Sequence, residues 1–282
     1  MNPEDTAINE CLQSRLVVER NALLKRAVAW FQRQSDVLGI FLAGSLAAGT
    51  ADPWADIDLR VLATEEGQTR LLAGRLQWPE AWGELLFNEW ASGVDCCVSH
   101  FQPFLKLDVL YFSVRTLHPF PWLAQPVHVY QDQTGRLAEV LQLSRALTAA
   151  PCDVAEVSRV LSKALATLHE CIRRLPRGEL MVAQAMLGQL REYMMQLYEA
   201  ERRQPPWEVS MGRREAKLSM VFRTALADSY VGLDAVAIRR AAQSLARVLR
   251  GQVTSLHQSY VLGRSEASDL RAVDMIVTDA IG

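Results

Sequence analysis

The sequence lacks most features that are typical of secreted proteins, membrane proteins and small zinc-binding proteins. It holds five cysteines, an odd number without C-x-x-C spacing, so neither a disulfide framework nor a zinc site is expected. The longest uncharged stretch near the start, residues 37–51, is too short for a membrane span and is broken by glycines. The opening residues 1–5 are acidic where a signal peptide would be basic. We therefore expect a cytoplasmic protein that does not enter a membrane.

An excess of charge of one sign is also missing. Thirty Lys and Arg against 32 Asp and Glu give a formal net charge of −2. Binding along a phosphate backbone favours a clear basic excess, so nucleic acid is an unexpected partner. Half of the residues are hydrophobic, which is enough for a packed core and argues against disorder. At about 150 residues per domain, the 282 residues predict roughly two domains.

The pattern of the sequence changes once, near the turn at residues 132–135. Before it, short β-branched and aromatic segments alternate with helical patches. Strands are predicted at residues 40–42, 57–62, 94–101, 107–114 and 127–130. After it, apolar residues recur with helical spacing around Leu161, Leu187 and Leu249, and the break at residues 204–207 separates two helices. The pattern predicts an α+β domain over residues 1–134 and a helical domain over residues 135–282.

Two aspartates stand out at the strand predicted for residues 57–62. Asp56 and Asp58 are two apart, so in a strand they project from the same face with Cα atoms about 6.5 to 7 Å apart. Two converging carboxylates repel each other and resist desolvation unless a cation neutralises them. Carboxylate oxygens suit Mg²⁺, which also accepts substrate phosphates as ligands. The pair therefore indicates a magnesium site.

A third acid fits the same site. Asp108 lies in the strand predicted at residues 107–114, between apolar neighbours. If that strand lies beside the one carrying Asp56 and Asp58, three carboxylates surround one pocket. Such a set can hold two metal ions about 3.5 to 4 Å apart. Asp95 stays open as an alternative third carboxylate, or as a residue that caps a turn.

Gly44 and Ser45 supply a complementary phosphate-binding element. They follow a buried apolar strand and open a run of small residues that can begin a short helix. Glycine lets a phosphate approach the backbone, while N–H groups at a helix start and the Ser45 hydroxyl can bind it. Neither a P-loop nor the dinucleotide fingerprint G-x-G-x-x-G is present at this position.

Together, Gly44-Ser45, Asp56-x-Asp58 on a strand and Asp108 on a later strand resemble the nucleotidyltransferase superfamily of DNA polymerase beta. Within it, the chain is similar to the antibiotic nucleotidyltransferases that act on aminoglycosides and lincosamides. The specific match covers roughly residues 38–62 and Asp108, and residues 129–135 resemble the strand and turn that close the catalytic domain. The resemblance implies a polymerase-beta-like catalytic domain, with a mixed sheet and flanking helices, followed by a helical substrate-binding bundle.

The resemblance also implies roles for these residues. Gly44 and Ser45 would hold the β- and γ-phosphates, and Asp56 and Asp58 would bind Mg²⁺, with two ions expected. Asp108 would be the third ligand, the general base for an acceptor hydroxyl, or both; some antibiotic-modifying members have Glu at this place.

Four further features stay open at the level of sequence. Arg60 departs from the family pattern, where an apolar residue is commoner, and it either braces the carboxylates or contacts a phosphate. Trp54 either stacks on a base or sugar or packs as a lid. The basic group Arg213, Arg214 and Lys217 is a solvated helix surface or touches phosphate, and we assign Lys217 provisionally to nucleotide binding. Glu192 and Glu199 either face solvent, the favoured interpretation, or meet a cationic acceptor.

The function that follows is magnesium-dependent transfer of a nucleoside monophosphate from ATP or another nucleoside triphosphate to a hydroxyl of a small molecule, with release of pyrophosphate. This is an EC 2.7.7-type reaction, and the resemblance favours an antibiotic such as an aminoglycoside or lincosamide as acceptor. A protein acceptor, a nucleotide-binding module without turnover and a sugar-nucleotide glycosyltransferase are the alternatives. Gly44-Ser45 makes the last less favoured, and a homodimer stays open.

Overall fold

The computed structural model describes residues 3–147, 152–202 and 217–278. Packing divides the chain into two compact units, Met1–Thr148 and Ala149–Gly282, which are described separately below. Within the described ranges, none of the helices combines the length and the apolar character needed to cross a membrane.

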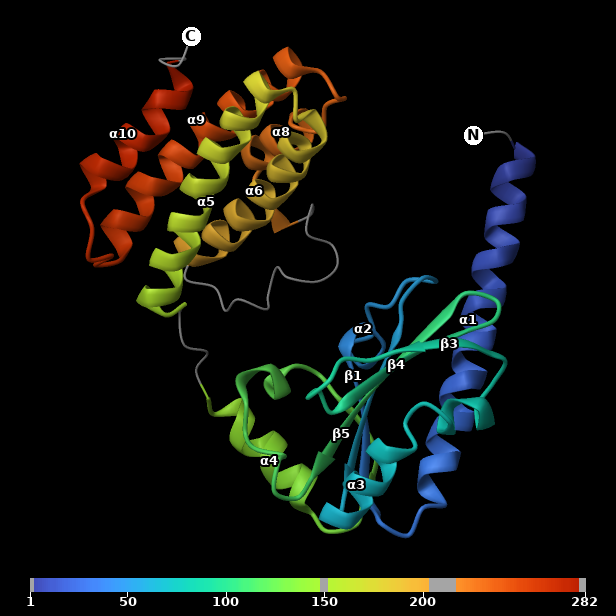
Figure 1. Ribbon diagram of the computed structural model, residues 1–282. Coiled ribbons are helices and arrows are strands. Elements are labelled where there is room, and N and C mark those ends of the chain that lie inside the picture. Colours follow the sequence, from blue (N-terminus) through green and yellow to red (C-terminus); the bar gives the residue numbers. More distant parts are fainter. Residues whose placement is uncertain (1–2, 148–151, 203–216, 279–282) are drawn as a thin grey trace. The chain divides into compact units, whose positions relative to one another are not determined.

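The N-terminal unit is built around a mixed six-stranded sheet (Figure 1). Its strands are β1 (Val37–Ala43), β2 (Ile57–Ala63), β3 (Leu85–Glu89), β4 (Cys96–Phe101), β5 (Leu105–Ser113) and β6 (His128–Asp132). Its helices are α1 (Pro3–Gln32), α2 (Gly44–Ala47), α3 (Glu65–Ala73) and α4 (Arg136–Arg145), with short 3-10 turns at Trp78–Ala81 and Pro121–Ala124. The strand order is β3-β4-β5-β2-β1-β6, with β2 and β5 parallel and the other neighbours antiparallel. The predicted α+β class with a mixed sheet is confirmed.

Each of the five predicted strands is present with shifted ends, and the elements that were not predicted include strand β3 and helix α1. Strand β3 lies at the edge of the sheet and pairs only with β4, so most of its side chains are exposed and its sequence shows no clean alternation. Helix α1 was missed although its apolar residues recur at helical spacing from Leu16 to Phe31.

One face of the sheet is covered by α1 and α3 (Figure 1). Alternate residues of β2 and β5 point into this layer, because side chains in a strand alternate between the two faces. The fully buried members from these strands are Ile57, Leu59, Val61, Ala63, Leu107, Val109 and Tyr111. Each fully buried aliphatic side chain contributes about 1.5 to 3 kcal/mol relative to an exposed one, so this layer is the core of the unit.

The opposite face is covered only in part, by α4. Leu137, Val140 and Leu141 of this helix pack against Phe41 and Leu62 in a second, smaller cluster. Helix α4 therefore belongs to the N-terminal unit, and the boundary predicted after residue 134 is one helix too early. The turn at residues 132–135 does not separate the units, because Asp132 accepts hydrogen bonds from the first backbone N–H groups of α4 and ties it to β6.

The regular elements in the described part of the C-terminal unit are helices. It contains α5 (Val154–Arg174), a 3-10 turn at Leu175–Arg177, α6 (Leu180–Glu201), α8 (Met220–Asp228), α9 (Ala235–Ser259) and α10 (Glu266–Val277). The helical spacing noted around Leu161, Leu187 and Leu249 is confirmed, since all three are fully buried in one core. Asp153 and Asp234 begin α5 and α9 by accepting hydrogen bonds from the backbone N–H groups of Ala155 and Ala237. The break predicted at residues 204–207 lies outside the described residues.

Candidate active site

The three acids meet where β2 and β5 run side by side. Asp58 and Asp108 are direct Cα partners in the parallel register of these strands. Both project from the face opposite α1 and α3, and both carboxylates are largely buried. Asp56 directly precedes β2, and the ammonium group of Lys106 lies between its carboxylate and that of Asp108. The structure therefore places the predicted strands as neighbours and brings the three carboxylates to one place.

Lys106 is the residue that joins the acids. Its Nζ donates to Asp56 Oδ2 at 3.0 Å and lies 3.1 Å from Asp108 Oδ2. Lys106 and Asp108 share a face of β5 because they are two residues apart in a strand. Sequence reasoning did not single out Lys106; its signal is a lysine that alternates with Asp108 in an otherwise apolar strand.

Arg60 braces the Asp58 carboxylate from within the protein. Its Nη2 donates to Asp58 Oδ1 at 3.0 Å, and its Nη1 donates to the carbonyls of Leu59 at 3.1 Å and Asp108 at 3.3 Å. The guanidinium lies 5.3 Å from the ring centre of Trp122, and Arg60 is only 8% exposed. Of the two roles left open by the sequence, this geometry favours bracing over contact with a phosphate.

Burial and charge oppose each other at Asp108 and Lys106. Desolvation raises the pKa of Asp108, and the Lys106 ammonium offsets this only in part, with Asp56 and Asp58 raising it further. Desolvation lowers the pKa of Lys106, but the hydrogen bond to Asp56 and the charges of both carboxylates outweigh it, so this pKa lies above its usual value. Asp108 Oδ1 is buried and has no hydrogen-bond partner among the described residues. This oxygen is an acceptor that a bound cation or its water would satisfy.

Gly44 lies against Asp58 because β1 ends opposite the start of β2, with Ala43 and Asp58 as partners. Its φ is +67°, and a Cβ atom built on it would lie 2.1 Å from Asp58 Oδ2. Only glycine fits this approach without displacing the carboxylate. Gly44 and Ser45 open α2, so they present backbone N–H groups that have no partner within the helix. The phosphate-binding element predicted from sequence thus lies directly beside the acids.

Two further features surround Asp56. Arg20 of α1 is buried, and its Nη1 donates to the carbonyls of Asp52 at 2.7 Å and Ala55 at 3.2 Å, which fixes the loop that carries Asp56. Trp54 in that loop packs edge-on against Phe104, with ring centres 6.3 Å apart, and the two are 52% and 77% exposed. Sequence reasoning noted Trp54 but missed Arg20 and Phe104, since neither belongs to the acidic motif.

The structure does not bring Asp95 to the acids, and it does not place the basic group of the C-terminal unit relative to them. Asp95 accepts a hydrogen bond from Gln68 Nε2 of α3 at 3.1 Å, so its carboxylate is engaged by the helix on the opposite face of the sheet. Lys217 lies in the C-terminal unit and is exposed. Arg213 and Arg214 lie outside the described residues.

The carboxylate oxygens of the three aspartates are of the type that binds a divalent cation. Asp56, Asp58 and Asp108 offer the hard oxygen donors that Mg²⁺ prefers, and the orphaned Asp108 Oδ1 supplies a ready acceptor. In the described part of the chain, however, no three His, Cys, Asp or Glu side chains are already gathered as a metal site. Lys106 and Arg60 each engage one oxygen of the carboxylates that they pair with.

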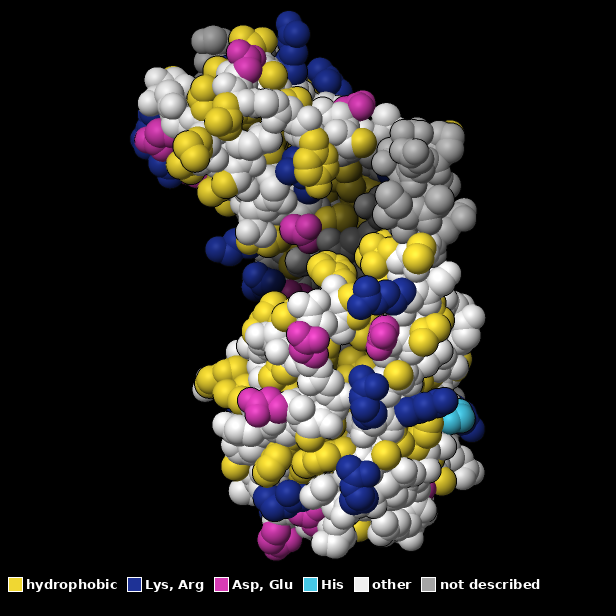
Figure 2. All heavy atoms as spheres, turned by 90° about the vertical axis from the view of Figure 1, so that its right-hand side faces the viewer, with side chains coloured by type: hydrophobic (Ala, Val, Ile, Leu, Met, Phe, Trp, Pro, Cys, Tyr) yellow, Lys and Arg dark blue, Asp and Glu magenta, His cyan; other side chains and the backbone are white. Residues whose placement is uncertain are grey.

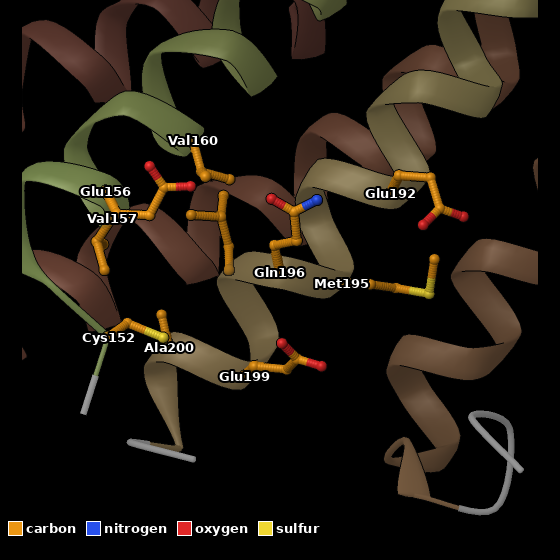
Figure 3. A pocket seen from close by; sticks show the side chains of 10 residues that line it. Cys152, Glu156, Val157, Val160, Glu192, Met195, Gln196, Glu199 and Ala200 are labelled. Atoms are coloured by element: carbon orange, nitrogen blue, oxygen red, sulfur yellow. The ribbon is translucent and has the colours of Figure 1, made fainter. Parts of the chain in front are cut away.

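A cavity of about 210 Å³ lies between α5 and α6 of the C-terminal unit (Figure 3). Its lining includes Glu156, Glu192, Glu199 and Cys152 beside apolar side chains. Glu199 is only 5% exposed, so the favoured interpretation of a solvent-facing residue is wrong for it, although Glu192 is exposed. The two glutamates line the same cavity because seven residues make about two turns of a helix. This pocket is acidic and belongs to one unit.

The surface of the N-terminal unit carries mixed charge on the face drawn in Figure 2. Lys and Arg side chains lie at several points down the middle of this face, with Asp and Glu side chains and apolar side chains among and beside them.

Comparison with known proteins gives matches only to solved structures. No protein-family model matches the chain, and no curated protein matches it. The chain is similar to an aminoglycoside 6-adenyltransferase from Bacillus subtilis at 11% identity and a TM-score of 0.40, with 92% of this chain and 98% of that chain covered. It is similar to a nucleotidyltransferase-like protein from Exiguobacterium sibiricum at 11% identity and a TM-score of 0.40, with 93% and 90% covered. Both are of the kind that the sequence resembles.

Proposed function

We propose that the protein is a magnesium-dependent nucleotidyltransferase that moves a nucleoside monophosphate from a nucleoside triphosphate to a hydroxyl of a small molecule. One observation carries this proposal: Asp58 and Asp108 are partners on parallel strands, with Asp56 joined to Asp108 through Lys106 and Gly44 packed on Asp58. Three partly buried carboxylates next to a glycine-led helix start form a site for a cation-bound polyphosphate.

Each group then has a defined task. Asp56, Asp58 and Asp108 would hold Mg²⁺, which would supply positive charge to neutralise the triphosphate. Gly44 and Ser45 offer backbone N–H groups and a hydroxyl to the terminal phosphates. Asp108, whose pKa is raised by burial, accepts the proton of the acceptor hydroxyl as its oxygen bonds to the α-phosphorus. The bond from that phosphorus to the β-phosphate oxygen breaks, and pyrophosphate leaves. Rate arises from positioning and charge neutralisation, without a covalent enzyme intermediate.

For the acceptor, we propose a hydroxyl compound that carries amino groups, such as an aminoglycoside or a lincosamide. The antibiotic class comes from the sequence resemblance. The acidic lining of the cavity between α5 and α6 is independent support, since carboxylates attract ammonium groups (Figure 3). Glu192→Gln is then expected to raise the KM for such an acceptor several-fold while leaving the KM for the nucleotide unchanged. An equal rise in both would contradict this assignment.

The experiment that tests the function is pyrophosphate release with Mg²⁺, each of the four nucleoside triphosphates and a panel of aminoglycosides and lincosamides. The matched control is the Asp56→Asn, Asp58→Asn double variant, which keeps side-chain volume but removes two charges. Release that needs acceptor, Mg²⁺ and both aspartates supports the proposal. Labelled nucleotide that stays on protein would indicate a protein acceptor. Nucleotide binding without turnover across the whole panel would refute the proposed enzymatic activity.

A further inference from the structure

Lys106 lies between two of the three acids of the candidate site. Its ammonium is within 3.0 Å of an oxygen of Asp56 and 3.1 Å of an oxygen of Asp108, which come from different elements. The side chain is 37% exposed, so its charge is partly shielded from water. A cation that bridges two carboxylates in this way takes over one task of a second metal ion, because it cancels the repulsion between the carboxylates and holds them together.

The net charge of the site also favours one divalent ion over two. Asp56, Asp58 and Asp108 bring three negative charges, and Lys106 and Arg60 return two positive ones, as their ion pairs show. The protein part of the site is therefore left with a net charge of −1. One divalent ion changes this to +1, a balance suited to a polyphosphate, whereas two would change it to +3. Like charges so close together in a partly buried site are costly.

The oxygens that remain also suit one ion. Asp58 Oδ1 is paired with Arg60, while Asp58 Oδ2 lies on the side of Gly44. Asp108 Oδ2 is paired with Lys106, while Asp108 Oδ1 is buried without a partner. Asp58 and Asp108 are direct partners across neighbouring strands, so these two oxygens belong to adjacent side chains.

We propose that the Lys106 ammonium is a built-in cation of the acid trio, and that the site takes one divalent ion rather than the two expected from the sequence. The inference rests on the proposed function for the presence of an ion at all. Lys106 is in this sense a positioning residue, because it acts through Asp56 and Asp108. The divalent ion is held on the side of the trio that faces Gly44.

The test counts bound Mn²⁺ by electron paramagnetic resonance in metal-free protein titrated with Mn²⁺ alone. The wild type is expected to bind one ion per chain at the site and Lys106→Met two, because the substitution frees an oxygen on each of two carboxylates. Lys106→Arg keeps the charge and is expected to bind one. Lys25→Met is the matched control, since Lys25 is exposed on α1 of the same unit, and it is expected to bind one.

A second readout is thermal stability, which reports folding as well as binding. Loss of the ammonium leaves the carboxylates to repel each other, so Mn²⁺ is expected to raise the melting temperature of Lys106→Met more than that of the wild type. If the Lys106→Met variant does not fold, the Lys106→Gln variant takes its place in both measurements. Two ions in the wild type, or the same count in wild type and both neutral variants, would overturn the inference. A wild type that releases pyrophosphate yet binds two ions would refute only the inference and leave the proposed function standing.

Discussion

The two faces of β2 and β5 differ sharply although they are made by the same short strands. On one face, Ile57, Leu59 and Val61 are fully buried under α1 and α3. On the other, Asp58 and Arg60 form an ion pair beside the acid of β5. Because side chains of a strand point alternately to the two faces of the sheet, one segment contributes both to the hydrophobic core and to the candidate site. The charged face is tolerated because each carboxylate has a cationic partner within the fold.

The largest expected effect comes from removing charge on the polar face. Asp58→Asn is nearly isosteric but lacks the charge that a divalent ion requires, so we expect kcat to fall by about 10² to 10³-fold. Pyrophosphate release measures the rate, and circular dichroism checks the fold. A variant with full activity in Mg²⁺ would remove Asp58 from the site.

Gly44→Ala is expected to rank second. The new Cβ would meet Asp58 Oδ2 at 2.1 Å, so the carboxylate must move away from its place, and we expect at least about a tenfold loss of kcat/KM for the nucleotide. Gly49→Ala is the matched control, because Gly49 has φ +69° and nothing within 4 Å of the added atom. Both variants carry the backbone strain of about 1 to 3 kcal/mol, so a difference in activity isolates the clash. Equal losses in the two would show that strain alone is responsible.

On the apolar face the expected effect is on stability instead. Leu59→Ala removes a fully buried side chain and should lower the unfolding free energy of the N-terminal unit by about 2 to 5 kcal/mol. Urea unfolding followed by tryptophan fluorescence measures this, since six of the seven tryptophans lie in that unit. The folded variant should keep nearly normal turnover at low temperature. A loss of turnover as large as that of Asp58→Asn would mean that the faces are not independent.

The smallest expected effect is a dependence of stability on pH. The pKa of Asp108 is raised in the folded protein by burial, so the folded state holds this proton to a higher pH than the unfolded chain does. Its contribution to stability is therefore present below an ordinary aspartate pKa of about 4 and is lost as pH rises through the folded pKa. Urea unfolding of metal-free protein between pH 4 and 7 should show this decline, and Asp108→Asn should reduce it. An unchanged decline would assign it to other groups.

Much of the site was predictable because it depends on local spacing. Gly44, Asp56 and Asp58 lie within one short stretch, and their order around a buried strand is enough to indicate a cation and a phosphate. Arg20 and Phe104 were not predictable, because each reaches this stretch only through tertiary contacts. The extent of the N-terminal unit was also missed, since α4 is attached by packing on Phe41 and Leu62 and by hydrogen bonds to Asp132, which form only in the folded unit.

The amino-acid order alone determined which side chains of β2 and β5 share a face, because alternation is a property of the extended backbone. It also determined that the second half of the chain forms helices with one buried side. Only the tertiary structure decided that β5 lies parallel to β2 with Asp108 opposite Asp58, and that Lys106 lies between two acids. Strand neighbours and ion pairs form between residues about 50 positions apart, and their pairing is selected by the packing of the whole sheet.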